Sequence, residues 1–221
     1  MKSKDDLKVV LKETGILLAI TIIIGLMLGF VYELTKEPIR LQQEKAIQEA
    51  CAAAFPSPEP GMIDLVFEPA NYIPDGTLEA ELAAKGVEIG NVYIVTYTSL
   101  TYGFVVEATS KNGYGGDIVL YVGVSTDGTV QGVSILELTE TPGLGMKAPD
   151  VLVPQFAGRS AESFVYTKTG AAAANEVDAI SGATITTSAV VDAVNGGIRT
   201  ARYLADNWNE VIVEIGGGVD E

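Results

Sequence analysis

The sequence predicts an α+β protein with a single N-terminal transmembrane helix, followed by a domain with an antiparallel sheet and a C-terminal helix. Three observations support this prediction. An uncharged apolar run fills residues 14–32, and four β-rich segments separated by turn signals follow between residues 91 and 137. Between residues 188 and 209, apolar side chains recur every three to four residues, which is typical of a helix.

The apolar run predicts a membrane anchor over residues 14–34. A bilayer requires about 20 apolar residues, whereas a signal peptide has a shorter core followed by a small-x-small cleavage site. Glu33 and Lys36 follow this run, so we expect an uncleaved helix. Gly25 and Gly29 form a G-x-x-x-G pattern, which either permits close helix packing or is merely tolerated.

The flanking charges suggest an orientation. Residues 1–13 hold four Lys, and we expect them to form a short cytoplasmic tail with the large domain outside the membrane, although the positive-inside bias is slight. We expect residues 35–60 to form a stem helix and a linker, because P-S-P-E-P-G at 56–61 breaks the helix. Residues 61–221 are expected to form the domain. Cys51 lies on the stem, and its free thiol has either no role or a functional one. The segment G-G-G-V-D-E at the end predicts a loose tail.

Within the domain, residues 91–98, 103–109, 117–124 and 130–137 are rich in β-branched and aromatic residues and predict an antiparallel meander. The last helix is expected over residues 188–209. Gly196 and Gly197 each cost about 1 kcal/mol relative to Ala, which weakens the expectation of one unbroken helix.

Composition excludes several classes of site. The chain has no His, so imidazole catalysis and His-ligated metals are excluded. Its one Cys cannot by itself form an internal disulfide, a Cys zinc site or an iron–sulfur cluster. The net charge of -15 would repel nucleic-acid phosphates. The sequence therefore predicts no metal site and no nucleic-acid partner.

Two short motifs are candidates for binding. S-G-A-T-I-T, residues 181–186, precedes the last helix and predicts either an anion site or an ordinary helix cap formed by Thr186 or Ser188. It lacks the Lys of a P-loop. E-T-P-G-L-G, residues 140–145, predicts either a rigid loop that presents Leu144 to a flat ligand or a tight turn with a buried Leu.

Together these motifs resemble a known family. Residues 178–186 resemble the flavinylation motif D-x-x-[ST]-G-A-[TS]-x-T of the FMN-binding domain family, and E-T-P-G-L-G stands upstream at that family's separation. The stretch 113–124 also looks like its strand region, and the resemblance covers most of residues 15–205. The single span and the chain length are most similar to the G subunits of the Rnf ion-translocating electron transport complex. The C subunits of the sodium-translocating NADH:quinone oxidoreductase are relatives.

The resemblance implies a covalent cofactor. FMN would be linked through its phosphate to Thr186, rather than to the adjacent Thr187, by a magnesium-dependent flavin transferase that uses FAD outside the cytoplasmic membrane. The transferase would activate the Thr186 hydroxyl, which would explain why this sequence places no catalytic base beside it. Further cofactor-binding residues are implied in both motifs: Ser181, Gly182, Ala183 and Thr184 near the phosphate, and Glu140, Thr141, Gly143 and Leu144 near the flavin ring.

The implied function is electron relay. The chain would be a redox subunit, with no catalytic residues of its own, of a membrane-bound ion-translocating ferredoxin:NAD oxidoreductase, with the other membrane subunits of the Rnf complex as partners. It would lie in the inner membrane with a single span. A C-type subunit of the quinone oxidoreductase, a membrane-anchored FMN redox sensor and a flavin-free structural subunit remain alternatives. Acidic surroundings are expected to lower the flavin potential, while the ion, the direction of electron flow and the contacts between subunits stay open.

Overall fold

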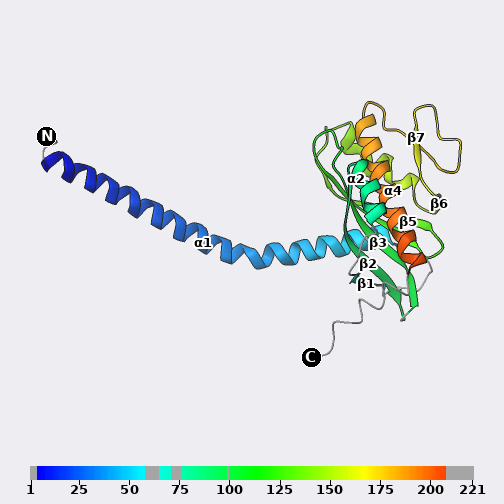
Figure 1. Cartoon of the computed structure of the whole chain (residues 1–221), viewed down its shortest axis with the longest axis horizontal. Coiled ribbons are helices and arrows are strands. Elements are labelled where there is room, and N and C mark those ends of the chain that lie inside the picture. The colour runs from blue at the N-terminus through cyan, green and yellow to red at the C-terminus, as the bar shows by residue number, and fades with distance from the viewer. Residues whose placement is uncertain (1–3, 58–64, 71–75, 99, 208–221) are drawn as a thin grey trace. The chain divides into compact units, whose positions relative to one another are not determined.

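A single long helix, α1 (Lys4–Ala54), begins the described part of the computed structural model, which describes residues 4–57, 65–70, 76–98 and 100–207 (Figure 1). The predicted span and the predicted stem are thus one continuous helix, with Pro38 inside it. In the described residues, α1 is the one helix long and apolar enough to cross a membrane. The Thr21 hydroxyl donates to Leu17 O at 2.7 Å, so this polar group is satisfied within its own helix.

The chain divides into two units, residues 1–46 and residues 47–221, so the last turns of α1 belong to the folded domain. Cys51, Ala54 and Phe55 are buried against one face of the sheet. A Cβ atom on Gly123 would lie 2.1 Å from Ala54 O, so only glycine permits the end of α1 to approach this strand so closely. The predicted boundaries at residues 13, 34 and 60 remain predictions.

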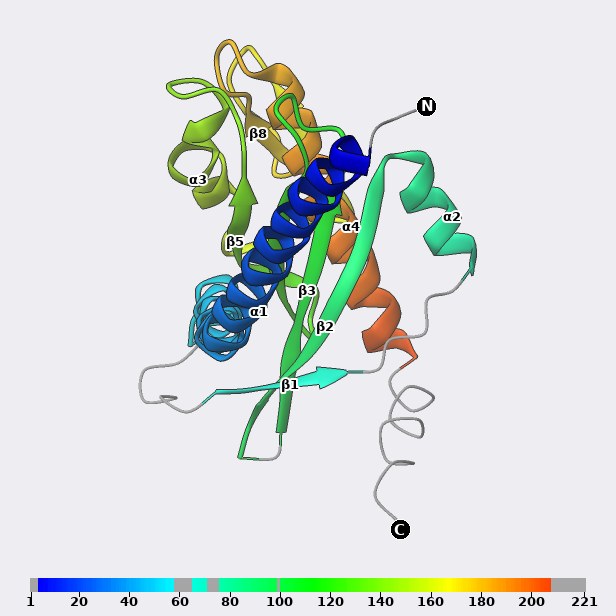
Figure 2. The ribbon, with the colours of Figure 1, turned by 90° about the vertical axis from the view of Figure 1, so that its left-hand side faces the viewer.

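The domain is built on a six-stranded antiparallel sheet with strand order β1-β2-β3-β4-β5-β6 (Figure 2). The four predicted strands are confirmed as a meander, because each pairs with the next one along the chain. The sequence did not predict the two edge strands, β1 and β6. The strands are β1 (Val66–Ala70), β2 (Val87–Tyr97), β3 (Leu100–Ser110), β4 (Ile118–Ser125), β5 (Thr129–Leu138) and β6 (Arg159–Ser160).

The last helix, α4 (Thr184–Asp206), packs on the face of the sheet opposite Cys51 and forms the larger core (Figure 2). It is unbroken, so the doubt raised by its two glycines was misplaced. A Cβ on Gly196 would lie 2.8 Å from Val87, and one on Gly197 would lie 2.7 Å from Val122. Both glycines therefore allow close packing of the helix on the sheet, which offsets their poor helix propensity.

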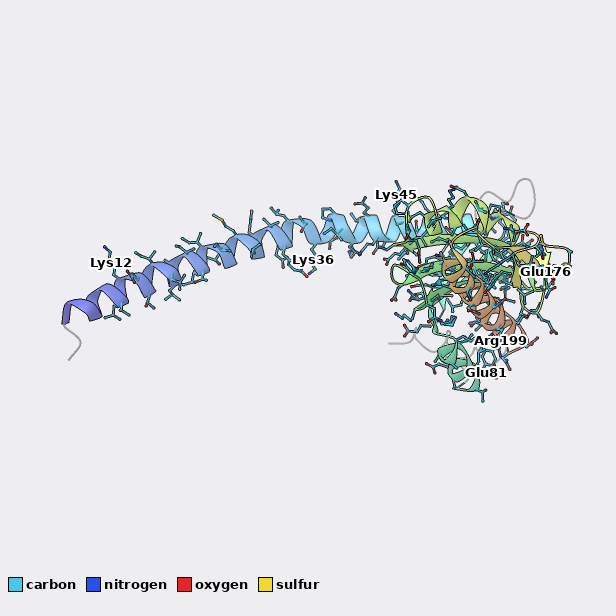
Figure 3. The ribbon with its side chains drawn as sticks, turned by 90° about the horizontal axis from the view of Figure 1, so that it is seen from above. Lys12, Lys36, Lys45, Glu81, Glu176 and Arg199 are labelled. Atoms are coloured by element: carbon cyan, nitrogen blue, oxygen red, sulfur yellow. The ribbon has the colours of Figure 1, made fainter. Side chains whose placement is uncertain are left out.

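A second helix, α2 (Gly76–Ala84), lies along β2 beside α4 (Figure 2). Its buried side chains, Leu78 and Leu82, join the larger core. An ion pair between Arg199 of α4 and Glu81 of α2 links the two helices on their exposed sides (Figure 3). Exposed pairs of this kind contribute less to stability than the apolar contacts beneath them.

Short elements connect β5 to α4: η1 (Gly145–Lys147), α3 (Ala148–Val151), η2 (Val153–Gln155), β6, β7 (Val165–Thr167) and β8 (Glu176–Asp178). β7 and β8 form a separate parallel pair. After these elements, the chain comes back, so that the start of α4 faces the loop that follows β5. The observed architecture is α+β, as predicted. Residues 58–61 of the predicted helix break, the predicted helix end at Asn209 and the predicted tail lie outside the described residues.

Candidate cofactor site

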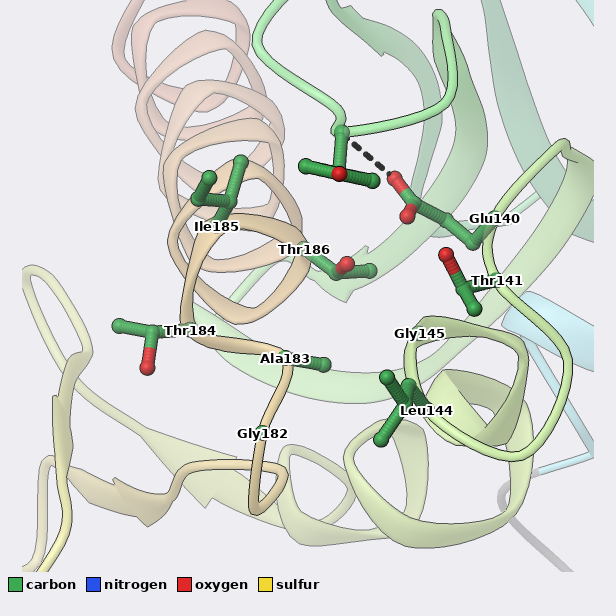
Figure 4. A pocket seen from close by; sticks show the side chains of 10 residues that line it. Glu140, Thr141, Leu144, Gly145, Gly182, Ala183, Thr184, Ile185 and Thr186 are labelled. Carbon is green, nitrogen blue, oxygen red and sulfur yellow. Dashed lines mark hydrogen bonds between the residues drawn. The ribbon is translucent and has the colours of Figure 1, made fainter.

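A pocket of about 510 Å³ opens between the start of α4 and the loop that follows β5 (Figure 4). Seven of the nine predicted site residues line it, whereas Ser181 and Gly143 do not. Sequence reasoning missed three lining residues, although all three stand inside stretches already singled out. The lining residues are Tyr114, Glu140, Thr141, Leu144, Gly145, Gly182, Ala183, Thr184, Ile185 and Thr186.

The helix begins earlier than predicted, at Thr184, and Ala183 is its N-cap without a side-chain cap. The prediction that Thr186 or Ser188 caps the helix is therefore wrong. Thr187 closes the turn instead: its hydroxyl accepts a hydrogen bond from Ile180 N–H at 3.1 Å and donates one to Ala183 O at 2.8 Å. A side chain one turn into the helix thus fixes the loop that precedes it.

The two adjacent threonines have different environments. Thr187 is fully buried and both of its hydroxyl bonds are made inside the protein. Thr186 is only 1% exposed, yet its Oγ1 has no hydrogen-bond partner among the described residues and its side chain lines the pocket. In Figure 4, the Thr186 side chain points toward Glu140 and Thr141, across the pocket from α4. Of the two threonines, Thr186 is therefore the one whose hydroxyl borders the pocket without a hydrogen bond among the described residues.

Gly145 keeps space open beside this hydroxyl. A Cβ atom there would lie 2.6 Å from Thr186 Oγ1 and 2.9 Å from Glu140 Oε2. The two oxygens are therefore no more than about 5.5 Å apart. Gly182 has a different constraint, because its φ of +78° lies in the left-handed region that disfavours other residues. Both glycines shape the pocket by having no side chain.

The E-T-P-G-L-G segment forms a tight turn. Leu144 N–H donates to Thr141 O at 3.1 Å, and Gly143 has a φ of +79°, which together with Pro142 at the preceding position matches a type II turn. Leu144 is 41% exposed, so the alternative with a buried Leu is wrong. It presents an apolar side chain to the pocket.

Exposed apolar and aromatic groups form the rim of the pocket. Tyr114 is 70% exposed and Ile185 is 53% exposed, and both line the pocket together with Leu144. Large side chains of this kind are usually covered when a binding surface is occupied. The rim therefore suits a flat, largely apolar ligand.

Glu140 is the one charged residue among those that line the pocket. It is 8% exposed, and its Oε1 accepts a hydrogen bond from Tyr114 N–H at 2.7 Å, the dashed line in Figure 4. It also accepts one from Gly115 N–H at 3.4 Å. This contact ties the loop between β3 and β4 to the loop after β5. No ion pair joins Glu140 to a cation in the described part of the chain.

A smaller pocket of about 240 Å³ adjoins the first on the other side of the S-G-A-T loop, and Lys168, Ser181 and Thr184 line it. Thr184 borders both pockets, but in Figure 4 its side chain points away from Thr186. The predicted cluster of small residues is thus split between two faces of one loop. Across the described ranges, no group of three or more Asp, Glu, Cys or His side chains could hold a metal.

Comparison with known proteins gives consistent results. Residues 113–199 match the FMN-binding domain family. The chain is 39% identical over 123 residues to the G subunit of the Na(+)-translocating ferredoxin:NAD(+) oxidoreductase complex of Acetobacterium woodii, over 55% of this chain and 59% of that relative. It is 32% identical over 175 residues to the G subunit of the ion-translocating oxidoreductase complex of Vibrio vulnificus, over 75% of this chain and 77% of the relative.

Among solved structures, the chain is similar to the C subunit of the Na(+)-translocating NADH-quinone reductase of Parabacteroides distasonis, with a TM-score of 0.54. The identity is 19%, and the match covers 75% of this chain and 95% of that structure. At this identity the likeness concerns the fold alone. It agrees with an antiparallel sheet covered by a long C-terminal helix.

Proposed function

Because the chain belongs to the family of G subunits of ion-translocating oxidoreductase complexes, we propose that it carries FMN as a phosphoester of Thr186 and relays electrons within such a complex. As in those relatives, it is a redox subunit of a larger complex. FMN, which fits the matched FMN-binding domain, supplies reversible electron transfer when bound. The protein supplies its position and its electrostatic surroundings.

One observation carries the assignment to Thr186. Its hydroxyl is unbonded among the described residues and lines the pocket, whereas the hydroxyl of Thr187 is engaged in two buried hydrogen bonds. A nucleophile must have a free lone pair and room for the incoming phosphorus. Gly145 provides that room, since any larger residue there would contact Thr186 Oγ1.

The pocket fits the rest of the cofactor. Its volume of about 510 Å³ lies within the usual range for small-molecule sites. We propose that the flavin ring lies against Leu144 and the exposed rim, where it would cover apolar surface. Glu140 and Thr141 face the same space and offer polar contacts (Figure 4).

The start of α4 suits the phosphate. The N–H groups of Thr184, Ile185 and Thr186 precede the first possible acceptor within the helix, so they have no partner inside it. A phosphodiester keeps one negative charge, which a helix N-terminus stabilises. Ser181 and Thr184 face the neighbouring pocket, so they would shape the loop and support the phosphate from its other side.

Attachment requires a second enzyme. In the proposed reaction, Thr186 Oγ1 attacks the phosphorus of the FMN half of FAD, a new O–P bond forms and the bond between the two phosphates breaks. AMP leaves, and the hydroxyl proton is lost. Glu140 makes no hydrogen bond to Thr186 among the described residues, so we assign the activation of the hydroxyl to a magnesium-dependent flavin transferase.

The apolar helix α1 and the membrane-complex relatives support a membrane location. We further propose that residues 1–13 lie in the cytoplasm, that the domain lies outside the inner membrane, and that the other membrane subunits of the Rnf complex deliver and accept the electrons. The relatives with the higher identity are G subunits, whereas the likeness to a C-type chain concerns the fold alone. This favours the G-type assignment over the C-type alternative.

In-gel fluorescence tests the proposal. The full chain is produced together with its flavin transferase, denatured and separated on a gel. The gel is then viewed under ultraviolet light for flavin fluorescence. We expect a fluorescent band for the natural chain and for Thr187→Ala, and none for Thr186→Ala. A dark band for the natural chain, in the presence of a transferase shown to be active on another acceptor, would overturn the proposal.

A further inference from the structure

The pocket lacks the positive charge that usually holds a flavin phosphate. Free FMN carries nearly two negative charges at neutral pH, because the second pKa of a phosphate monoester is about 6. Proteins commonly bind such groups with Arg or Lys. Among the residues that line this pocket there is neither, and Glu140 is the one charged group.

Glu140 is also fixed in place. It is 8% exposed, and backbone N–H groups of Tyr114 and Gly115 hold its Oε1. Its Oε2 lies near the point where a Gly145 Cβ would stand, no more than about 5.5 Å from Thr186 Oγ1. A phosphate that approaches the Thr186 hydroxyl therefore approaches a carboxylate that cannot swing far away.

We propose that Glu140 makes this pocket select against the free FMN phosphate, so that the unmodified chain takes neutral riboflavin in preference to FMN. The chain then becomes an FMN protein only through esterification, which reduces the phosphate charge from about two to one. This inference rests on the proposed function, since it requires that the flavin ring occupies the pocket. It adds the residue that sets the ligand preference.

The size of the preference follows from the geometry. At about 6 Å, one unit of like charge lowers affinity by roughly a hundredfold at an effective dielectric constant of about 20, and by about threefold if water screens it fully. The pocket is open to solvent, so we expect an intermediate value of about tenfold per charge. Thr186 lies in the first turn of α4, so the helix N-terminus opposes this effect. It supplies about half a unit of positive charge, against the full negative charge of the carboxylate.

Equilibrium titration of the full chain tests the preference. The Thr186→Ala chain, purified in detergent without flavin transferase, is titrated with riboflavin and with FMN at low ionic strength, and quenching of flavin fluorescence gives both affinities. We expect riboflavin to bind at least about tenfold more tightly than FMN. Added salt should narrow the difference, because the Debye length falls to about 3 Å at 1 M.

The Glu140→Gln substitution in the same background separates charge from structure. The Gln side-chain oxygen can still accept the hydrogen bonds from Tyr114 and Gly115, so the loops should stay joined. At about tenfold for each of the nearly two phosphate charges, we expect FMN binding to tighten by about a hundredfold. Riboflavin binding should change far less, because riboflavin has no phosphate. Glu137→Gln is the matched control, because it removes the same charge from an exposed position of β5 outside the pocket lining and should change neither affinity.

Several results would overturn the proposal: tighter binding of FMN than of riboflavin, equal effects of Glu140→Gln on both ligands, or no binding of either ligand to any variant. If FMN binds more tightly and Lys168→Gln removes that advantage, a cation in the neighbouring pocket determines the preference instead. Thermal unfolding of each variant verifies folding. These outcomes are separate from in-gel fluorescence of the natural chain, which tests the covalent attachment itself.

Discussion

Replacing Thr187 with Ala should lower the stability of the domain while leaving the cofactor attached. Replacing Thr186 with Ala should prevent attachment while leaving the stability nearly unchanged. The prediction follows from one structural difference. Thr187 makes two buried hydrogen bonds that hold the loop before α4, whereas the hydroxyl of Thr186 makes none among the described residues. The two substitutions are chemically identical and one residue apart.

The expected loss for Thr187→Ala can be estimated from its contacts. Ile180 N–H would be left buried without an acceptor, which costs about 1–3 kcal/mol, and the buried methyl group adds about 1 kcal/mol. Better helix propensity of Ala returns about 0.5 kcal/mol. The net loss of about 1.5–3.5 kcal/mol should lower the Tm of a domain of this size by roughly 3–14 °C.

The matched variants make the measurement specific. Thermal unfolding is followed by circular dichroism on chains produced without the transferase, so that the cofactor adds no stability of its own. Thr187→Ser keeps the hydroxyl and should recover at least half of the lost Tm, while Thr186→Ala should stay within about 1 kcal/mol of the natural chain. In-gel fluorescence is then measured on the same variants produced with the transferase.

Two results would refute this reasoning. If Thr186→Ala lowers the Tm as much as Thr187→Ala, the hydroxyl of Thr186 has a structural partner and is not held free for reaction. If Thr187→Ala folds normally but loses its fluorescent band, the flavin is attached to Thr187. Either result would reverse the roles assigned to the two residues.

Three further substitutions test other parts of the account. Gly145→Ala places a methyl group 2.6 Å from Thr186 Oγ1 and should slow flavin attachment at least tenfold in a time course of in-gel fluorescence, and attachment at the natural rate would contradict it. Thr200→Val removes a buried hydroxyl without a hydrogen-bond partner among the described residues and should raise the Tm by about 2–4 °C, whereas a fall would indicate a missed partner. The Ser125 hydroxyl lowers the pKa of Asp127 in the turn between β4 and β5, so this carboxylate stabilises the fold above its unfolded pKa and the effect is lost as pH falls through its lowered folded pKa. Asp127→Asn should therefore cost about 0.5–1 kcal/mol at pH 7 in urea unfolding and progressively less below about pH 4, and a cost independent of pH would contradict the assignment.

The meander and the long helices could be predicted because their signals are local. β-Branched runs between turn residues mark β2 to β5, and helical spacing marks α4. The edge strands could not be predicted in the same way. β1 is short, includes Pro69 and is defined by its pairing with β2, so its existence depends on a contact distant in sequence.

The start of α4 was misplaced because its N-cap has no signal. Ala183 carries no capping side chain, and the residue that closes the turn, Thr187, lies inside the helix. The glycine pair in α4 was misjudged for a related reason. Propensity measures the cost of Gly in an isolated helix, whereas Val87 and Val122 occupy the space that side chains at Gly196 and Gly197 would need.

For the site, the motifs identified the correct two loops but not the geometry between them. Spacing cannot show that Gly145 separates Thr186 from Glu140, or that Ser181 faces the neighbouring pocket. The burial of Glu140 was equally hidden, because its partners at Tyr114 and Gly115 are backbone groups in a different loop. Only the fold brings these groups together.

The most direct test of the central claim is mass spectrometry of the tryptic peptide that covers residues 169–199, taken from native protein made together with its flavin transferase. The account predicts a mass increase of one FMN less one water, with fragmentation that assigns it to Thr186. An unmodified peptide at full abundance, or the same mass increase on Thr187 or Ser181, would contradict it.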